Sequence, residues 1–175
     1  MGFNLFFRHV ILGLAASTGV LLFCIKAEAA ERVVLKYSIL RESVSVPELT
    51  ALAQTGEVSS DLQAYLNMAG KSPDELRQAL RQQVKVNPIL LYQVLKSPVG
   101  EALLDRVAYV IHTPDEQANR QSLRSALVSS ALKDSNITLI EVLENYPTPE
   151  VEVEGDRIAS VYRQLKKLEE RLPKI

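Results

Sequence analysis

Helix-start signals recur along the chain and constrain its fold more than any other feature. A Ser or Thr followed three residues later by Glu is a capping box, in which two side chains satisfy free backbone N–H groups at the start of a helix. The pattern appears at Ser45/Glu48, Ser72/Glu75, Thr113/Glu116 and Thr138/Glu141. Asn87-Pro88 and Ser97-Pro98 add two starts of the cap-and-proline type, and Pro73 and Pro114 also stand at first helical positions. Six such signals in one chain predict a multi-helix domain.

Apolar residues recur at helical spacing between these starts. Leu62, Tyr65, Leu66 and Ala69, for example, fall at positions i, i+3, i+4 and i+7. The longest stripe is formed by Ile158, Val161, Tyr162, Leu165, Leu168 and Leu172. Charged or amide residues lie between the apolar ones, so each helix should bury one face and expose the other. We predict helices near 47–55, 60–69, 73–84, 88–96, 98–111, 115–133, 138–145 and 156–171.

Two segments break the helical period and predict a small sheet. Arg32–Leu40 is rich in β-branched and aromatic residues, and Glu150–Glu154 alternates between acidic and apolar residues. Ser43–Val46 is a candidate third strand. A single strand leaves its backbone groups unpaired, so we expect these pieces to pair with one another. Arg32, Lys36 and Arg41 would then face Glu150, Glu152 and Glu154 across the strands. The predicted fold is mainly α, a helical bundle closed by two or three strands that pair the N-terminal strand with 150–154. Asn145–Pro149 is predicted to be a hinge-like loop.

Residues 1–29 have the organisation of a secretory signal peptide. A short head with Arg8 precedes the apolar run Val10–Ile25, and the small-residue triplet Ala27-Glu28-Ala29 follows. The run has sixteen residues, whereas a spanning helix needs about 20. We therefore predict cleavage after Ala29, a single helical domain over 30–175, and export to the periplasm, the thylakoid lumen or the outside medium. The alternative is an uncleaved N-terminal membrane anchor. A lipoprotein with Cys24 as its first residue is disfavoured because Phe23 is large.

Composition excludes several classes of function. Cys24 is the single cysteine and is removed with the signal, so thiolate metal sites, disulfides and cysteine nucleophiles are excluded from the mature chain. Removing Arg8, Lys26 and Glu28 from totals of 20 basic and 21 acidic residues leaves 18 and 20. This balanced charge argues against nucleic acid as a partner, and we expect contact with a membrane only if the signal is uncleaved.

No motif in the mature chain indicates a catalytic, cofactor or metal site. A Gly-x-Ser-x-Gly elbow is missing, and the isolated glycines form no phosphate loop or dinucleotide fingerprint. His112 is the single histidine after residue 29. It is a candidate base for a distant serine, but we favour a structural role at the C-terminal end of a helix, beside the Thr113 cap. The sequence therefore assigns no catalytic, cofactor-binding or metal-ligating residue, no cofactor, and no definite enzyme activity.

The remaining acidic and aromatic residues have simpler structural explanations. Asp74/Glu75 and Asp115/Glu116 fall in first turns of predicted helices, and Glu169/Glu170 fall on a solvated helix face. Glu150, Glu152 and Glu154 fit either a calcium site or, as we favour, an exposed strand face. The tyrosines are interpreted as core residues whose hydroxyl groups reach a partner: Tyr37, Tyr65, Tyr92, Tyr109, Tyr146 and Tyr162.

The order of several short motifs resembles a known family. The strand Val33, Leu35, Tyr37 is followed by V-S-V-x-E-L at Val44–Leu49 and T-G-E-V-S at Thr55–Ser59. S-P-x-G-E-x-L-L (Ser97–Leu104), L-R-S-A-L (Leu123–Leu127) and I-T-L-I-E-V-L (Ile137–Leu143) come next, and Tyr146-Pro147 closes the series. From about Ala30 to Leu172 the chain is similar to the domain of unknown function at the N-terminus of cyanobacterial alpha/beta hydrolases. The resemblance implies a helical domain that precedes a separate hydrolase domain with a serine nucleophile, none of whose catalytic residues has a counterpart here.

Three functions follow as hypotheses. The favoured one is an exported, non-catalytic accessory module that binds a partner or an apolar ligand; its partner would be a separately encoded alpha/beta hydrolase or a second copy of the chain. The second is an esterase- or lipase-type hydrolase that acts through a serine near His112. The third is a carrier of small lipids or pigments in the space between helices. The first is favoured because catalysis requires positioned nucleophilic or acid–base groups.

Overall fold

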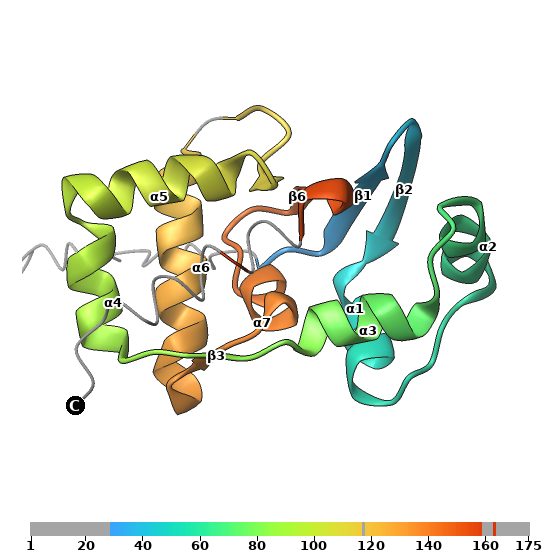
Figure 1. Ribbon diagram of the computed structural model, residues 1–175, viewed down its shortest axis with the longest axis horizontal. Helices are drawn as coiled ribbons and strands as arrows, with labels where there is room; N and C mark the ends of the chain where they lie inside the picture. Colours follow the sequence, from blue (N-terminus) through green and yellow to red (C-terminus); the bar gives the residue numbers. More distant parts are fainter. Residues whose placement is uncertain (1–28, 117, 159–162, 164–175) are drawn as a thin grey trace, which may run out of the picture.

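The computed structural model describes residues 29–116, 118–158 and 163 (Figure 1). The elements in chain order are β1 (Arg32–Tyr37), β2 (Leu40–Ser45), α1 (Val46–Gln54), α2 (Ser60–Met68), α3 (Pro73–Arg81), β3 (Val84–Lys85), α4 (Pro88–Leu95), α5 (Pro98–Ala108), β4 (Ile111–His112), α6 (Asn119–Asp134), β5 (Asn136–Ile137), α7 (Leu139–Glu144), β6 (Glu150–Glu154) and the 3-10 turn η1 (Gly155–Arg157). Seven α-helices and two small sheets in this part of the chain confirm the mainly α prediction.

Five of the six predicted helix starts are confirmed by side-chain caps. Ser72 and Thr138 form complete capping boxes with the Glu three residues later. Ser45 accepts a hydrogen bond from the backbone N–H of Glu48. Asn87 and Ser97 cap α4 and α5, each with proline at the first helical position. Local hydrogen-bonding chemistry therefore determines these boundaries, as the sequence pattern predicts.

The sixth predicted start, Thr113/Glu116, is wrong. Thr113 donates both its N–H and its hydroxyl to Asn119 Oδ1, each at 2.9 Å, and its carbonyl accepts from the Glu116 N–H in a turn. Helix α6 begins only at Asn119, after Ala118 in a left-handed conformation and without a side-chain cap. Asp115 and Glu116 therefore lie in a loop, not in a first helical turn.

A four-stranded sheet in the order β2-β1-β6-β4 joins the two ends of the domain. Strand β1 pairs antiparallel with β2 and parallel with β6, in a register that places Lys36 beside Glu154. The predicted pairing of the N-terminal strand with 150–154 is thus confirmed. The predicted strand Arg32–Leu40 is in fact a hairpin, because Ser38 adopts a positive φ of 55° and turns the chain into β2.

Three two-residue strands are not predicted by the sequence pattern. Val84–Lys85 pairs with Asn136–Ile137 where the pattern extends a helix to residue 84. His112 pairs with Glu152 in β4, where a helix end is predicted; α5 stops at Ala108. These strands are too short for a periodic pattern, and their pairing partners lie far away in sequence.

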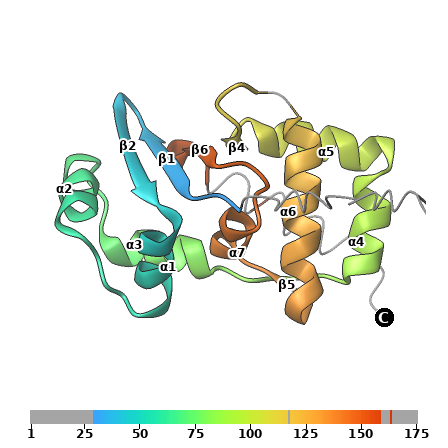
Figure 2. The same ribbon diagram turned by 180° about the vertical axis from the view of Figure 1, so that it is seen from behind.

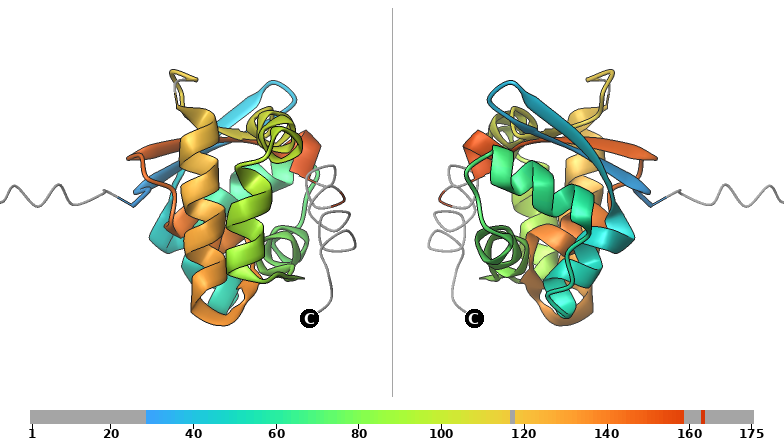
Figure 3. Two further views of the ribbon diagram at one scale, coloured as in Figure 1. Left: turned by 90° about the vertical axis from the view of Figure 1, so that its left-hand side faces the viewer. Right: turned by 90° about the vertical axis from the view of Figure 1, so that its right-hand side faces the viewer.

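Six of the seven described α-helices form two groups that meet beneath the sheet, and α2 packs against β2. Helices α4, α5 and α6 pack together, α1, α3 and α7 form the second group, and the α6–α7 contact joins them (Figures 1 and 2). Seen from either end, the sheet lies across one side of these helices (Figure 3). The apolar sides of β1 and β6, with Val33, Val151 and Val153, belong to the same buried cluster as Leu49 and Leu104. One continuous core therefore supports both helix groups.

Two predicted segments fall largely outside the described residues. The predicted signal peptide lies there except for Ala29, and of the predicted helix 156–171 the structure describes residues 156–158 and Arg163. Among the described residues, no helix combines the length and apolar character needed to cross a membrane.

The tyrosines divide between the core and the surface. Tyr65 is buried and donates a hydrogen bond to the Leu35 carbonyl, as predicted, whereas Tyr109 is 70% exposed. Tyr146, which lies in the loop predicted as a hinge, is fully buried. Its hydroxyl has no hydrogen-bond partner among the described residues, and burial raises its pKa. The loop is therefore anchored in the core by this ring.

Tyr146→Phe should stabilise the protein, because it removes a buried polar atom that gains no hydrogen bond on folding. We expect the free energy of unfolding to rise by about 1 kcal/mol. Tyr65→Phe is the matched control: it leaves the Leu35 carbonyl without its donor and should lower the free energy by about 1 kcal/mol. Urea unfolding of both variants measures the two effects. A loss of stability in Tyr146→Phe would contradict this account.

Candidate functional site

Two hollows on the surface bring together residues that are distant in sequence. The first, called the polar cleft, has a volume of about 640 Å³. It is lined by Lys36, Asp105, Ala108, Tyr109, His112, Glu116, Ala118, Asn119, Arg120, Glu152, Glu154 and Arg157. The cleft contains His112, the single candidate base of the sequence, and two of the three strand glutamates.

Glu152 lies at the centre of the charges in the polar cleft. Side chains of a strand alternate between its two faces, so the pairing of β6 with β1 and β4, and of β1 with β2, brings basic residues to the side of Glu152 opposite the core. Its carboxylate accepts hydrogen bonds from Lys36 Nζ and Arg41 Nη2, each at 2.5 Å. Glu152 is only 5% exposed, which corrects the prediction that the strand glutamates form an exposed face. The predicted cross-strand charge match is confirmed for Lys36 and Arg41.

The basic neighbours keep Glu152 ionised. Burial raises the pKa of Glu152, but the hydrogen bond from Lys36 and the charges of Lys36, Arg41 and His112 outweigh burial and bring the pKa below 4.5. The hydrogen bond to Glu152 also raises the pKa of Lys36 above 10.5, against the opposing effect of burial. Both groups are therefore charged over the whole neutral range.

His112 is held in place by acceptors. Its Nδ1 lies 3.0 Å from the Thr113 carbonyl and 3.7 Å from Glu152, and its Nε2 lies 3.7 Å from Glu154. A carbonyl oxygen only accepts, so Nδ1 carries a proton. A Ser–His pair needs a hydroxyl within hydrogen-bond distance of the imidazole, and none of the described serines makes that contact. His112 thus joins β4 to the sheet, which corrects its predicted place at a helix end.

Two of the strand glutamates, Glu152 and Glu154, are paired with basic side chains. Lys36 and Arg41 already neutralise Glu152, and Lys36 Nζ also lies 3.4 Å from Glu154. Among the described residues, no group of three or more His, Asp and Glu side chains is arranged to hold a metal ion. The interpretation of these carboxylates as partners of basic residues accounts for their contacts.

The loop that borders the cleft is fixed by an ion pair between α5 and α6. Arg120 donates to Asp105 through Nε at 2.5 Å and through Nη2 at 2.7 Å. This bidentate hydrogen bonding lowers the pKa of Asp105 and raises that of Arg120. The charged side chains at the centre of the polar cleft, Lys36, Glu152 and Arg120, are therefore engaged with partners in a structural charge network.

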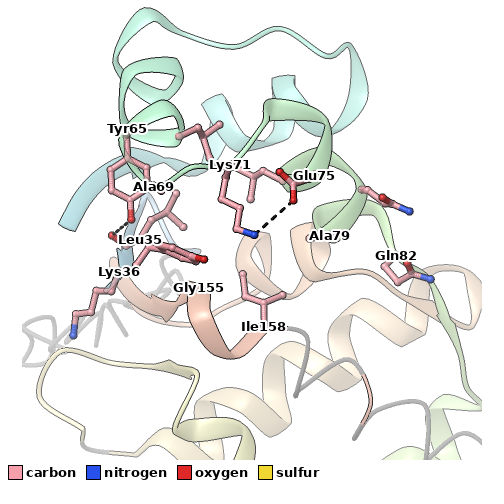
Figure 4. Close-up of a pocket in the computed structure, with 14 residues that line it drawn as sticks. Leu35, Lys36, Tyr65, Ala69, Lys71, Glu75, Ala79, Gln82, Gly155 and Ile158 are labelled. Atoms are coloured by element: carbon pink, nitrogen blue, oxygen red, sulfur yellow. Dashed lines mark hydrogen bonds and ion pairs between the residues drawn. The ribbon is translucent and has the colours of Figure 1, made fainter. Parts of the chain in front are cut away.

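The second hollow, called the apolar groove, has a volume of about 390 Å³ and different chemistry. Three separate parts of the chain line it: the end of β1, the α2–α3 region, and the turn after β6 (Figure 4). Its lining residues are Leu35, Lys36, Tyr37, Tyr65, Leu66, Ala69, Lys71, Glu75, Leu76, Gln78, Ala79, Gln82, Gly155 and Ile158. The volume and the mainly apolar lining are typical of ligand- and peptide-binding sites.

A rigid wall and a charged rim border the apolar groove. Tyr65 Oη donates to the Leu35 carbonyl at 3.1 Å and fixes α2 against β1; burial raises the pKa of Tyr65 to about 12. On the rim, Lys71 Nζ lies 3.6 Å from Glu75 and 5.7 Å from the centre of the Tyr37 ring. Figure 4 shows Lys71 and Glu75 on one side of the hollow and Ile158 facing them. An apolar floor with charges at its edge suits an amphipathic occupant.

A narrow cavity of about 50 Å³ continues the apolar groove toward the core. The two hollows share Ala79, Gln82 and Ile158. Beyond these residues the cavity is lined by core side chains such as Val107 and Leu127. The groove therefore opens onto the main apolar core.

Sequence patterns do not identify the apolar groove. Its lining residues belong to helical stripes that the spacing predicts to face the core, and nothing local distinguishes Ala69 or Ala79 from a residue in a packed interface. The groove exists because the parallel pairing of β1 with β6 brings Ile158 next to α3.

These features define a mainly helical domain with a small mixed sheet, a structural charge network and an apolar groove. The model of the family described as alpha/beta hydrolase of unknown function (DUF1400) matches residues 29–154. The chain belongs to this family, which confirms the resemblance; the matched region ends at β6, before Leu172. Searches of curated proteins and of solved structures gave no match.

Proposed function

We propose that this chain is an exported, non-catalytic module of its family and that its apolar groove receives an amphipathic helix from an alpha/beta-hydrolase core. The observation that carries the proposal is the groove itself, which has an apolar floor and the Lys71–Glu75 pair at its edge. A helix with one apolar face binds such a groove through side chains at i, i+3, i+4 and i+7. A hydrolase core is the partner that the family description suggests.

The contacts of His112 support a role other than catalysis. The imidazole is surrounded by Thr113, Glu152 and Glu154, and all three lie within the sheet or directly beside it. An ester hydrolase needs a nucleophile that passes its proton to such a base. The sequence of residues 1–29 supports export, because a charged head, an apolar run and Ala27-Glu28-Ala29 occur in the order of a secretory signal.

The test measures binding and catalysis with the purified exported chain. Isothermal titration with the purified hydrolase core of a family member should show a complex. Ala79→Asp should weaken binding at least about tenfold, because it places a carboxylate on the apolar floor. Asn67→Asp adds the same charge on α2 outside the groove and should leave binding unchanged. Hydrolysis of short and long nitrophenyl esters by the chain itself should stay at the background rate.

Four outcomes would count against the proposal. A hydrolase core that does not bind would exclude the partner, and equal weakening by Ala79→Asp and Asn67→Asp would exclude the groove. Ester hydrolysis that disappears in His112→Ala would show that the chain is an enzyme that acts through His112. Native mass spectrometry of the purified chain with a bound lipid or pigment would favour the carrier hypothesis instead.

A further inference from the structure

Ile158 connects the apolar groove to the part of the chain that follows it. Its side chain lines both the groove and the narrow cavity behind it and packs against the core. Figure 4 shows it directed into the hollow, opposite Lys71. The chain therefore continues into residue 159 directly from a side chain in the wall of the groove.

The sequence after Ile158 continues an apolar stripe at helical spacing. Val161 and Tyr162 lie three and four residues after Ile158, and Leu165, Leu168 and Leu172 continue the series at steps of three or four residues. At about 100° of rotation per residue these side chains share one face. Arg163 falls on the opposite face at the same spacing, and the structure assigns it to a helix and leaves it exposed. An exposed Arg163 is expected if the other face is covered.

We propose that residues 159–172 dock their apolar stripe in the apolar groove, where they compete with the partner helix. This inference rests on the groove of the proposed function and states how the access of a partner helix to that groove is regulated. Because the segment is joined to Ile158 in the wall, docking is intramolecular and benefits from a high effective concentration. A partner helix binds only after displacing the segment, so the groove is occupied until a stronger competitor arrives.

Thiol labelling tests the docking in the full chain. Cys24 is the single cysteine, so Cys24→Ser provides a background without thiols. In that background, Leu165→Cys places a thiol on the stripe and Arg163→Cys places one on the opposite face. The rate of reaction with a charged maleimide should be at least about tenfold lower at position 165, which corresponds to docking by about 1.4 kcal/mol.

Groove variants then show where the stripe is buried. Adding Ala79→Asp should bring the rate at position 165 up to that at position 163, whereas Asn67→Asp should leave the protection intact. Equal rates at positions 163 and 165 in the parent chain would overturn the proposal. Protection that survives Ala79→Asp would also overturn it, because the segment would then be covered by another surface. Both measurements are independent of the hydrolase titration, so either proposal can fail while the other holds.

Discussion

Alanine in place of Gly100 should lower the free energy of unfolding by at least about 3 kcal/mol. Gly100 lies in the first turn of α5, where α5 crosses the end of α4. A Cβ atom there would lie 2.0 Å from the Val94 carbonyl oxygen and 2.6 Å from Leu95 Cα. Both are backbone atoms, so no side-chain rotation can relieve the overlap, and the two helices would have to separate. The loss is a large part of the stability of an ordinary domain.

Gly70→Ala is the matched control for this substitution. Gly70 has a positive φ of 65°, and a Cβ atom added to it would meet no other atom within 4 Å, so alanine there costs only backbone strain of about 1 kcal/mol. Urea titration followed by circular dichroism gives both values. Equal losses at the two positions would show that the close approach of α4 and α5 does not limit stability.

The helical part of the fold could be predicted because its determinants are local. A capping side chain accepts a hydrogen bond from a backbone N–H two or three residues away, as Ser72 and Thr138 do. An apolar stripe indicates which face of a single helix is buried. The same pattern misleads at Thr113, where a residue six positions away, Asn119, supplies the acceptor. Local motifs therefore predict structure only where no tertiary contact uses the same groups.

The sheet and the groove depend on pairing between distant residues. The alternation of acidic and apolar residues in 150–154 predicts a strand, and the opposite charges of Lys36 and Arg41 suggest which strand pairs with it. The parallel direction of that pairing, and the pairing of His112 with the same strand, depend on the packed core. Exposure of Glu152 is the wrong expectation because alternation places its side chain opposite the core but does not show that Lys36 and Arg41 cover that side. The apolar groove lies where three such segments meet, so no single stretch of sequence contains it.

Glu152→Gln should lower the free energy of unfolding by about 2–3 kcal/mol. Removing one member of a buried ion pair costs about 3–5 kcal/mol. We expect less here, because the Arg41 side chain is 58% exposed and regains water, and Lys36 keeps Glu154 at 3.4 Å. Asp105→Asn is the control: it also removes a carboxylate that accepts two charged hydrogen bonds, but both partners are exposed, so the loss should be much smaller.

The pH dependence of the stability lost in Glu152→Gln distinguishes the contribution of the Glu152 charge from that of its packing. The pKa of Glu152 is lower in the folded protein than the ordinary 4.5, so the unfolded chain binds the proton more tightly. The stabilisation by Glu152 is therefore fully present above about pH 4.5 and is lost as the pH falls through the folded pKa. The difference in stability between the parent and Glu152→Gln should be constant near neutrality and shrink below about pH 4.5. A difference that persists at about pH 2 would mean that Glu152 acts through shape and hydrogen bonding and not through its charge.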